Sequence, residues 1–122
     1  MTLQVLAAGL SVCKVSDLSG VDLSGELYFL GKTDRELSLV CPTDRVPERT
    51  LAREDGWRAL RVAGSLDFSL VGVLAGIAGI LARNGISIFA LSTYDTDYIL
   101  TKEEQFERAL TALQQAGYAV VR

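Results

Sequence analysis

The chain has 122 residues, 49% of them apolar, and a formal net charge of −3 at pH 7. This length allows one compact domain or two very small ones, and the apolar content is high enough to form a buried core. The acidic balance and the scattered positions of the lysines and arginines argue against nucleic acid as a partner.

The sequence has no histidine and only two cysteines. Without histidine it lacks the usual general base, the commonest zinc ligand and every Ser–His or Cys–His nucleophile pair. Cys13 and Cys41 lie in separate apolar runs and form no metal motif, so we expect buried, reduced thiols rather than redox or ligand groups. We therefore predict a protein that is not an enzyme and that needs no cofactor and no metal.

Two apolar segments have to be distinguished from export and membrane signals. No lysine or arginine precedes the apolar N-terminus, which therefore lacks the basic start of a signal peptide. The apolar run from Leu70 to Ala82 is shorter than the roughly 20 residues that a membrane-spanning helix needs. We expect a cytoplasmic protein with no membrane partner.

The first part of the chain is predicted to consist mainly of strands. One long strand is expected over Leu3 to Val15, with a bend at Gly9. The segment Ser16 to Gly25 is rich in Ser, Asp and Gly, is too polar and short for a packed helix, and predicts a loop. Two more strands, a hairpin-like turn between them and a linker with both prolines follow in the order Glu26 to Gly31, Lys32 to Arg35, Glu36 to Cys41 and Pro42 to Asp55.

From Trp57 onward, strands and helices are predicted to alternate. Apolar residues recur at helical spacing from Leu70 to Leu81, and Asn84-Gly85 predicts the end of that helix. Thr101 to Glu104 has the pattern of a capping box and predicts a second helix, which ends at Gly117. The predicted strands are Trp57 to Val62, Ile86 to Leu91, Tyr98 to Leu100 and Tyr118 to Val121. This βαββαβ order is ferredoxin-like, so the predicted fold class is α+β, with both helices on one face of a four-stranded antiparallel sheet.

A weak internal repeat relates the two parts of the chain. Phe29 to Val40 resembles Phe89 to Leu100, because in both a strand with Phe meets a polar turn and an acidic residue opens the next strand. These acidic residues are Glu36 and Asp97. The loop after Val15 would replace the first helix of the upstream copy, and chance similarity is the alternative.

The run Gly64 to Ala75, GSLDFSLVGVLA, followed by Gly85 to Leu100, GISIFALSTYDTDYIL, resembles the ACT domain family. Leu10 to Cys13 and Glu36 to Pro42 also resemble small bacterial members, so the resemblance extends over nearly the whole chain. It implies a partial ACT-like repeat over residues 1–52 and a complete ACT domain over residues 53–122. It further implies a regulatory or sensor protein that binds an amino acid without catalysis, and a homodimer in which a second sheet completes the pocket.

The family resemblance also implies a set of ligand-binding residues. In the arginine sensors of this family, the aspartate that matches Asp97 contacts the ligand. Ser69 stands near where those sensors use a glutamate, so arginine itself is not implied. Carried over by position, the set is Asp67, Phe68, Ser69 and Gly72 in the strand–helix loop, and Thr93, Tyr94 and Asp97 in the facing turn.

The chemistry of these residues fits a zwitterionic ligand. Free amides at a helix N-terminus near Ser69 to Gly72 favour a carboxylate, and Asp97 accepts hydrogen bonds from a positive group. Thr93 and its neighbour Ser92 would orient the rest of the ligand. The alternative for Asp97 is to stabilise its own turn through backbone amides, and the alternative for Tyr94 and Phe68 is ordinary core packing.

Other patterns leave further alternatives open. Gly72, Gly76 and Gly79 share one helix face, where either another element or a ligand approaches closely. Asp95 and Asp97 lack the further clustered ligands of a metal site, and Gly31-Lys32-Thr33 ends a strand rather than opening a helix, unlike a P-loop. A hydrolase of the acylphosphatase type would need an arginine in the loop before the first helix, which has none. The remaining alternative function is an interaction module that regulates a partner enzyme without binding a metabolite.

Overall fold

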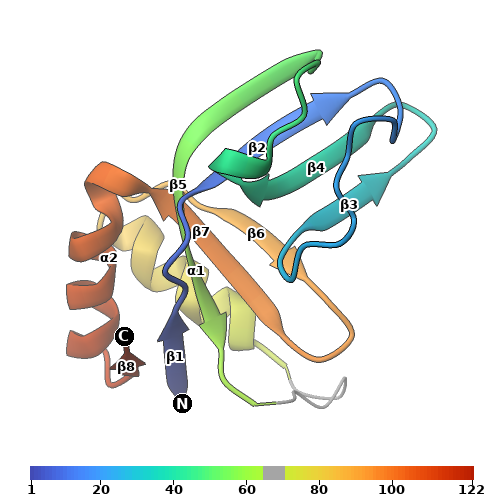
Figure 1. The fold of residues 1–122 in the computed structure, drawn as a ribbon. Coiled ribbons are helices and arrows are strands. Elements are labelled where there is room, and N and C mark those ends of the chain that lie inside the picture. The colour runs from blue at the N-terminus through green and yellow to red at the C-terminus, as the bar shows by residue number, and fades with distance from the viewer. Residues whose placement is uncertain (65–70) are drawn as a thin grey trace. The chain divides into compact units, whose positions relative to one another are not determined.

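The computed structural model describes residues 1–64 and 71–122 (Figure 1). The described chain divides into two compact units. Met1–Ala7 and Arg58–Arg122 form one, the helical unit, and Ala8–Trp57 form the other, the strand unit. Strand β5 (Ala52–Val62) contributes residues to both. The division into repeats at residues 52 and 53 stays a prediction.

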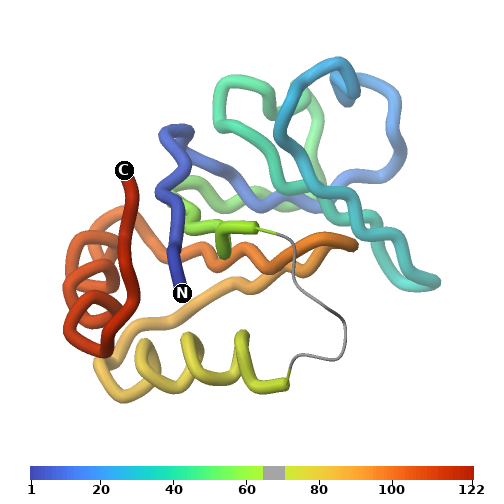
Figure 2. Tube along the Cα trace, turned by 90° about the horizontal axis from the view of Figure 1, so that it is seen from below, coloured from blue at the N-terminus to red at the C-terminus, as the bar shows by residue number. Residues whose placement is uncertain are grey.

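The helical unit has the α+β architecture predicted from the sequence. Its sheet has the order β8-β1-β5-β7-β6, and helices α1 and α2 cover one face of it (Figure 2). Besides β5, the elements are β1 (Thr2–Val5), α1 (Val73–Arg83), β6 (Phe89–Ser92), β7 (Asp97–Lys102), α2 (Glu103–Gln115) and β8 (Ala119–Val121). Strand β1 is an addition to the predicted βαββαβ pattern, and its pairing with β8 is parallel while its pairing with β5 is antiparallel.

The core of the helical unit lies between this sheet and the two helices. From the helices it takes apolar residues at the spacing that predicted them, among them Ile77 and Leu81 of α1 and Phe106, Leu110 and Leu113 of α2. These pack against strand residues that are equally buried, including Leu3, Leu60, Val62 and Ile99. Burial of such a side chain contributes on the order of 1.5–3 kcal/mol to folding. Because these side chains must all reach the sheet, they recur at the helical period, and this spacing predicted the helices.

The helix ends agree with the sequence in part. Asn84 caps the C-terminus of α1 and Gly85 follows with φ 71°, as predicted. The predicted capping box of α2 is wrong. Lys102, not Thr101, is the N-cap, and no described side chain bonds the first amides. Thr101 is fully buried in β7, and its hydroxyl donates to the Lys102 carbonyl over 3.4 Å.

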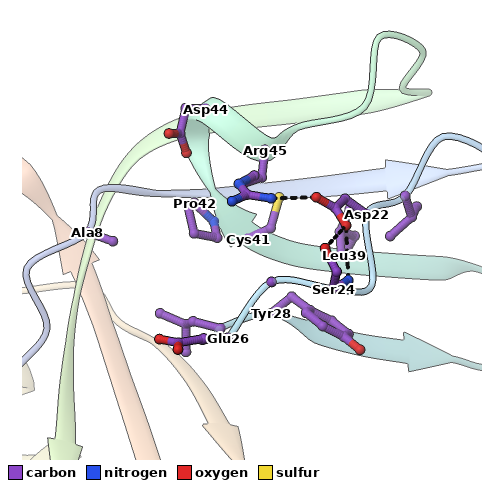
Figure 3. A pocket seen from close by; sticks show the side chains of 13 residues that line it. Ala8, Asp22, Ser24, Glu26, Tyr28, Leu39, Cys41, Pro42, Asp44 and Arg45 are labelled. Carbon is purple, nitrogen blue, oxygen red and sulfur yellow. Dashed lines mark hydrogen bonds and ion pairs between the residues drawn. The ribbon is translucent and has the colours of Figure 1, made fainter.

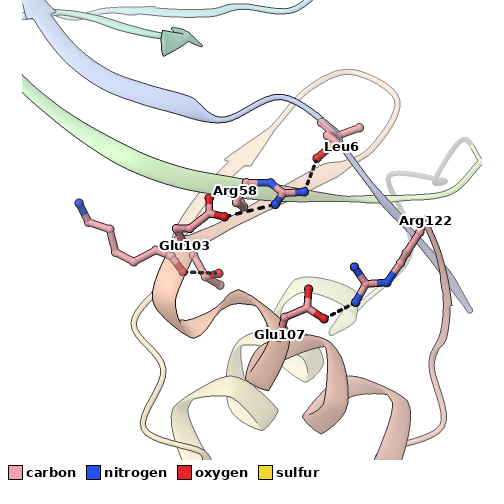
Figure 4. Close-up of polar contacts among 7 residues, drawn as sticks. Leu6, Arg58, Glu103, Glu107 and Arg122 are labelled. Atoms are coloured by element: carbon pink, nitrogen blue, oxygen red, sulfur yellow. Dashed lines mark hydrogen bonds and ion pairs between the residues drawn. The ribbon is translucent and has the colours of Figure 1, made fainter.

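Arg58 connects β5 to two other parts of the helical unit (Figure 4). Its Nη2 donates to the Leu6 carbonyl over 3.3 Å, and its Nη1 lies 3.6 Å from the carboxylate of Glu103. The guanidinium also lies 4.7 Å from the centroid of the Phe106 ring. Arg122, at the C-terminus, forms an ion pair with Glu107 of α2. Both side chains are exposed, so this pair contributes little to stability.

The strand unit contains only strands and a single 3₁₀ turn among its described elements. The strand order is β3-β4-β2-β5, with antiparallel pairing throughout. The bounds are β2 (Leu10–Val15), β3 (Phe29–Lys32), β4 (Leu37–Pro42) and η1 (Thr43–Arg45). Its core is small: Cys13, Val15, Leu39 and Cys41, covered by Val21 and Tyr28 from the segment between β2 and β3.

Two sequence predictions for this region are wrong. The expected single strand over Leu3 to Val15 is two strands, β1 and β2, separated by residues 6–9. The expected linker ends in strand, since β5 begins at Ala52 and pairs with β2. The first five side chains of β5 are exposed, and several of them are charged. A charged, exposed stretch resembles a linker in sequence, which is why the start of this strand was missed. The pairing shifts between Leu10 and Val12, and Gly56, with φ 85°, accommodates this bulge.

Candidate functional site

The predicted ligand turn is the tip of the β6–β7 hairpin. Ser92 pairs with Asp97 at the end of the ladder. The Thr93 amide donates to the Thr96 carbonyl over 2.9 Å, and the Thr93 hydroxyl donates to the same oxygen over 3.2 Å. The turn is therefore held by its own backbone and one threonine.

A buried hydrogen bond fixes this turn against the end of β5. The hydroxyl of Thr96 donates to the carbonyl of Val62, the last residue of β5, over 2.8 Å. Thr96 is 7% exposed, so water competes little for this bond. Because β5 leads on toward α1, the bond places the turn at the sheet end where the strand–helix connection leaves (Figure 1).

Asp97 presents a carboxylate at this end of the sheet. Ser92 donates its hydroxyl to Asp97 Oδ1 over 2.6 Å, in a contact at the surface of the hairpin. A carboxylate has about four acceptor positions, and among the described residues only Ser92 is seen to donate to this one. The other positions suit an ammonium or guanidinium group. Thr93 and Tyr94 lie in the same turn, and Tyr94 is 81% exposed. The structure therefore does not place Tyr94 in the core, which was the alternative to its role as a wall.

Gly72 occupies the N-cap of α1, the second part of the predicted site. Its φ of 83° is a left-handed conformation that favours glycine, and its carbonyl accepts from the Gly76 amide over 2.8 Å. No described side chain caps this helix end, and its first turn has no acidic residue. The first amides of α1 are thus suited to an anionic group. The other predicted site residues, Asp67, Phe68 and Ser69, lie outside the described residues.

The β3–β4 hairpin of the strand unit has the same pairing register as this site. Phe29 pairs with Val40 as Phe89 pairs with Leu100, so corresponding residues lie 60 positions apart, from 29 to 89. The Thr33 amide also donates to the Glu36 carbonyl over 2.9 Å, as Thr93 does to Thr96.

This register corrects the residue alignment of the predicted repeat. Asp97 corresponds to Leu37 rather than to Glu36, and Ser92 corresponds to Lys32. A hairpin of this geometry therefore forms without the Ser–Asp pair. Folding of the turn alone does not account for Asp97.

Comparison with known families decides the identity of the chain. The sequence model described as the ACT domain matches residues 52–115, from the start of β5 to the end of α2. The chain belongs to the ACT domain family. ACT domains are typically regulatory domains that bind small molecules such as amino acids.

Relatives of this ACT domain are found in both animals and bacteria. The cytosolic arginine sensor for mTORC1, subunit 1, is 32% identical in mouse and 37% identical in human, over 91 residues that cover 74% of this chain. The chain spans only about a quarter, 27%, of those sensors. A crystal structure from Agrobacterium tumefaciens matches 98% of this chain and 91% of its own, with 28% identity and a TM-score of 0.87. The regulatory subunit of aspartate kinase from Thermus thermophilus, 12% identical with a TM-score of 0.68, shares the fold.

Of the three glycines on one face at α1, only Gly76 lies close to another described element, and a Cβ at Gly72 would meet nothing within 4 Å. A Cβ at Gly76 would lie 3.4 Å from the Tyr118 hydroxyl, and one at Gly79 would lie 3.4 Å from Nη1 of Arg83. Cys13 and Cys41 are free and buried, as predicted, and burial raises the pKa of both thiols, that of Cys41 to about 11. Among the described residues, no His, Cys, Asp or Glu cluster could hold a metal ion, and neither helix is long and apolar enough to cross a membrane.

Sequence reasoning missed one residue that builds this site and overlooked a second region. Thr96 lies inside the recognised motif but was not assigned a role, although its hydroxyl bonds the last residue of β5. A single threonine among several hydroxyls gives no signal for such a contact. The polar segment of the strand unit was treated as a loop, and its cavity is described below.

Proposed function

We propose that this ACT domain binds an amino acid and acts as a non-catalytic regulatory or sensor protein in the cytosol. The observation that supports this most directly is the Thr96–Val62 hydrogen bond, which holds the Asp97 turn at the end of β5. This bond adds to the pairing of β7 with β5, and it fixes the turn residue next to Asp97 to the last residue of β5. The resemblance to the arginine sensors adds support for an amino acid as the ligand.

In this proposal the ligand's two charges have separate partners. The first amides of α1, after Gly72, receive the α-carboxylate, because the helix dipole and free N–H groups favour an anion there. Asp97 receives the positive group in a charge-assisted hydrogen bond. Thr93 and Tyr94, together with Asp67, Phe68 and Ser69, complete the proposed set. Which amino acid fits depends on the side chain that this set admits.

The first experiment is a thermal-shift screen of the purified protein against the twenty amino acids and related metabolites. A ligand stabilises the folded state by RT ln(1 + [L]/Kd), about 2.7 kcal/mol at a hundredfold excess over Kd. We expect a dose-dependent rise in melting temperature for one or two compounds. No rise at millimolar concentrations would favour the alternative, an interaction module that regulates a partner protein.

Three variants separate the charge of Asp97 from its role in the turn. Asp97→Asn keeps an oxygen that accepts from Ser92 but removes the charge, and Asp97→Ala removes both. Ser92→Ala removes the hydrogen bond but keeps the charge. We expect ligand stabilisation to be lost in both Asp97 variants and retained in Ser92→Ala, with unliganded melting temperatures close to that of the wild type.

A different pattern of ligand stabilisation in these variants would show that Asp97 stabilises the turn rather than binds the ligand. If Ser92→Ala and Asp97→Ala both lose the response while Asp97→Asn keeps it, the hydrogen bond matters and the charge does not. A protein that unfolds on Asp97→Ala would support the same conclusion. The β3–β4 hairpin argues against that result, because it has Leu37 at the corresponding position.

A further inference from the structure

The strand unit contains a cavity of about 540 Å³ that is separate in sequence from the proposed ACT site (Figure 3). Its lining comes from β4, from the segment after Gly20, and from η1. Leu39 and Cys41 form its bottom, and Leu27, Tyr28 and Pro42 add apolar walls. This volume lies in the range of pockets that hold small molecules.

The cavity lies where the helical unit has a helix. By the shared register, Leu39 corresponds to Ile99, which is fully buried in the core beneath α1 and α2. In the helical unit β7 leads directly into α2, whereas β4 leads into the 3-residue turn η1. From the segment between β2 and β3, Val21 and Tyr28 pack against the small core of this face. A face that the ACT pattern covers with helices is thus left partly open.

The charged groups of the lining are not balanced. Arg45 pairs with Asp22, whose carboxylate also accepts from the Ser24 amide over 3.0 Å. Glu26 and Asp44 remain, and neither forms an ion pair with a described residue. Figure 3 shows these two side chains toward the Ala8 and Pro42 end, with the Arg45–Asp22 pair beyond them. Two exposed carboxylates in one lining, with no ion pair to a described residue, attract a cation.

We propose that this cavity is a second small-molecule site, which binds an amphipathic organic cation. The ammonium group lies at the end marked by Glu26 and Asp44, and the apolar body lies against Tyr28, Leu39 and Pro42. Burial of the body supplies affinity, and the two carboxylates select the charge. An anion of the same shape would meet the same carboxylates and be repelled.

Isothermal titration calorimetry with three matched probes tests the charge selection. Phenethylammonium is the cation, 2-phenylethanol is its neutral counterpart of similar shape, and 3-phenylpropionate is the anion. We expect the cation to bind about tenfold more tightly than the alcohol, the difference that one charge-assisted hydrogen bond makes, and the anion not to bind. Equal affinity for the cation and the alcohol would overturn the proposal.

Variants locate the binding in the cavity. In Glu26→Gln/Asp44→Asn the advantage of the cation over the alcohol should disappear, while the affinity for the alcohol is unchanged. The control is Asp34→Asn/Glu36→Gln, which makes the same change in net charge on the β3–β4 turn, outside the cavity lining. If the control loses as much affinity as the cavity variant, the effect is one of net charge and the proposal fails.

Binding of the cation in the cavity is expected to be independent of the proposed amino-acid site. The titrations are repeated in Asp97→Ala, which disables the proposed ACT site in the helical unit and leaves every lining residue of the cavity in place. Phenethylammonium should bind this variant as it binds the wild type. Loss of binding in Asp97→Ala would show that the probe occupies the ACT site, and would contradict a second site.

Discussion

At the scale of single residues, Cys41 illustrates how burial controls a titratable group. Its thiol is 3% exposed, and burial, with the neighbouring Cys13 thiol, raises its pKa from 9.0 to about 11. A raised pKa in the folded state means that the neutral thiol stabilises the fold below pH 9, and that this contribution is lost as the pH rises toward 11. The loss is on the order of 2 kcal/mol.

We therefore predict that Cys41→Ala flattens the alkaline decline in stability. The free energy of unfolding, measured by urea denaturation between pH 8 and 11, should fall more steeply for the wild type than for the variant. Comparing slopes removes the cost of the smaller side chain, which lowers both ends of the curve. Parallel curves for the two proteins would show that the thiol does not titrate in this range.

The position of a turn could be predicted from the sequence, whereas residues that distant pairing brings together could not. Thr93 and Asp97 were expected in one polar turn because they lie in a short segment between two apolar runs, and both lie at the β6–β7 turn. Their role in binding stays a prediction. Glu26 and Asp44 are separated by a hairpin in sequence, and only the pairing of β3 with β4 brings them to one cavity. Neither residue has a neighbour in sequence that would mark it.

At the scale of elements, the three glycines of α1 have three different environments. Gly72 has φ 83°, which is strained for alanine, whereas Gly79 lies within the helix with only the flexible end of Arg83 near its missing Cβ. Gly76 is intermediate, because the Tyr118 hydroxyl lies at 3.4 Å. Gly79→Ala should stabilise the protein by about 0.5–1 kcal/mol through helix propensity, and Gly72→Ala should destabilise it by about 1–2 kcal/mol.

For Gly76→Ala we predict a change in the free energy of unfolding between these two values, close to zero. Removing the hydroxyl with Tyr118→Phe should then make Gly76→Ala stabilising by about 0.5–1 kcal/mol. Urea denaturation of the four proteins in this cycle measures the coupling. If Gly76→Ala is equally neutral in both backgrounds, the tyrosine is not the reason for the glycine.

Elements with a strong local pattern were predicted well, and elements defined by pairing were not. Both helices were predicted because apolar residues recur at the helical period. The start of β5 was missed, because Arg53, Glu54 and Asp55 show no alternation and their strand geometry comes from the ladder with β2. The bulge at Gly56 was missed for the same reason, because it arises from the register of β5 against β2. A glycine after an aspartate predicts a turn as readily as a bulge.

At the scale of the whole molecule, the ACT family resemblance raises the question of oligomeric state. The ACT domain model matches one stretch of the chain, residues 52–115, and the proposed ligand has contacts from a turn and a helix end on a single sheet. We propose that a second copy completes the pocket, so that binding and dimerisation are linked. By linkage, a ligand that binds the dimer more tightly must strengthen the dimer by the same factor.

Sedimentation analysis with the amino acid found in the thermal screen tests this linkage. We expect the dimer dissociation constant to fall in the presence of the ligand, by roughly 5- to 150-fold for a coupling of usual size. Asp97→Asn is the control, since it should dimerise without ligand as the wild type does and show no change on adding it. A ligand that saturates a monomer without changing its mass would place the whole pocket in one chain. The amino-acid proposal would then stand, and the dimer would not be part of the mechanism.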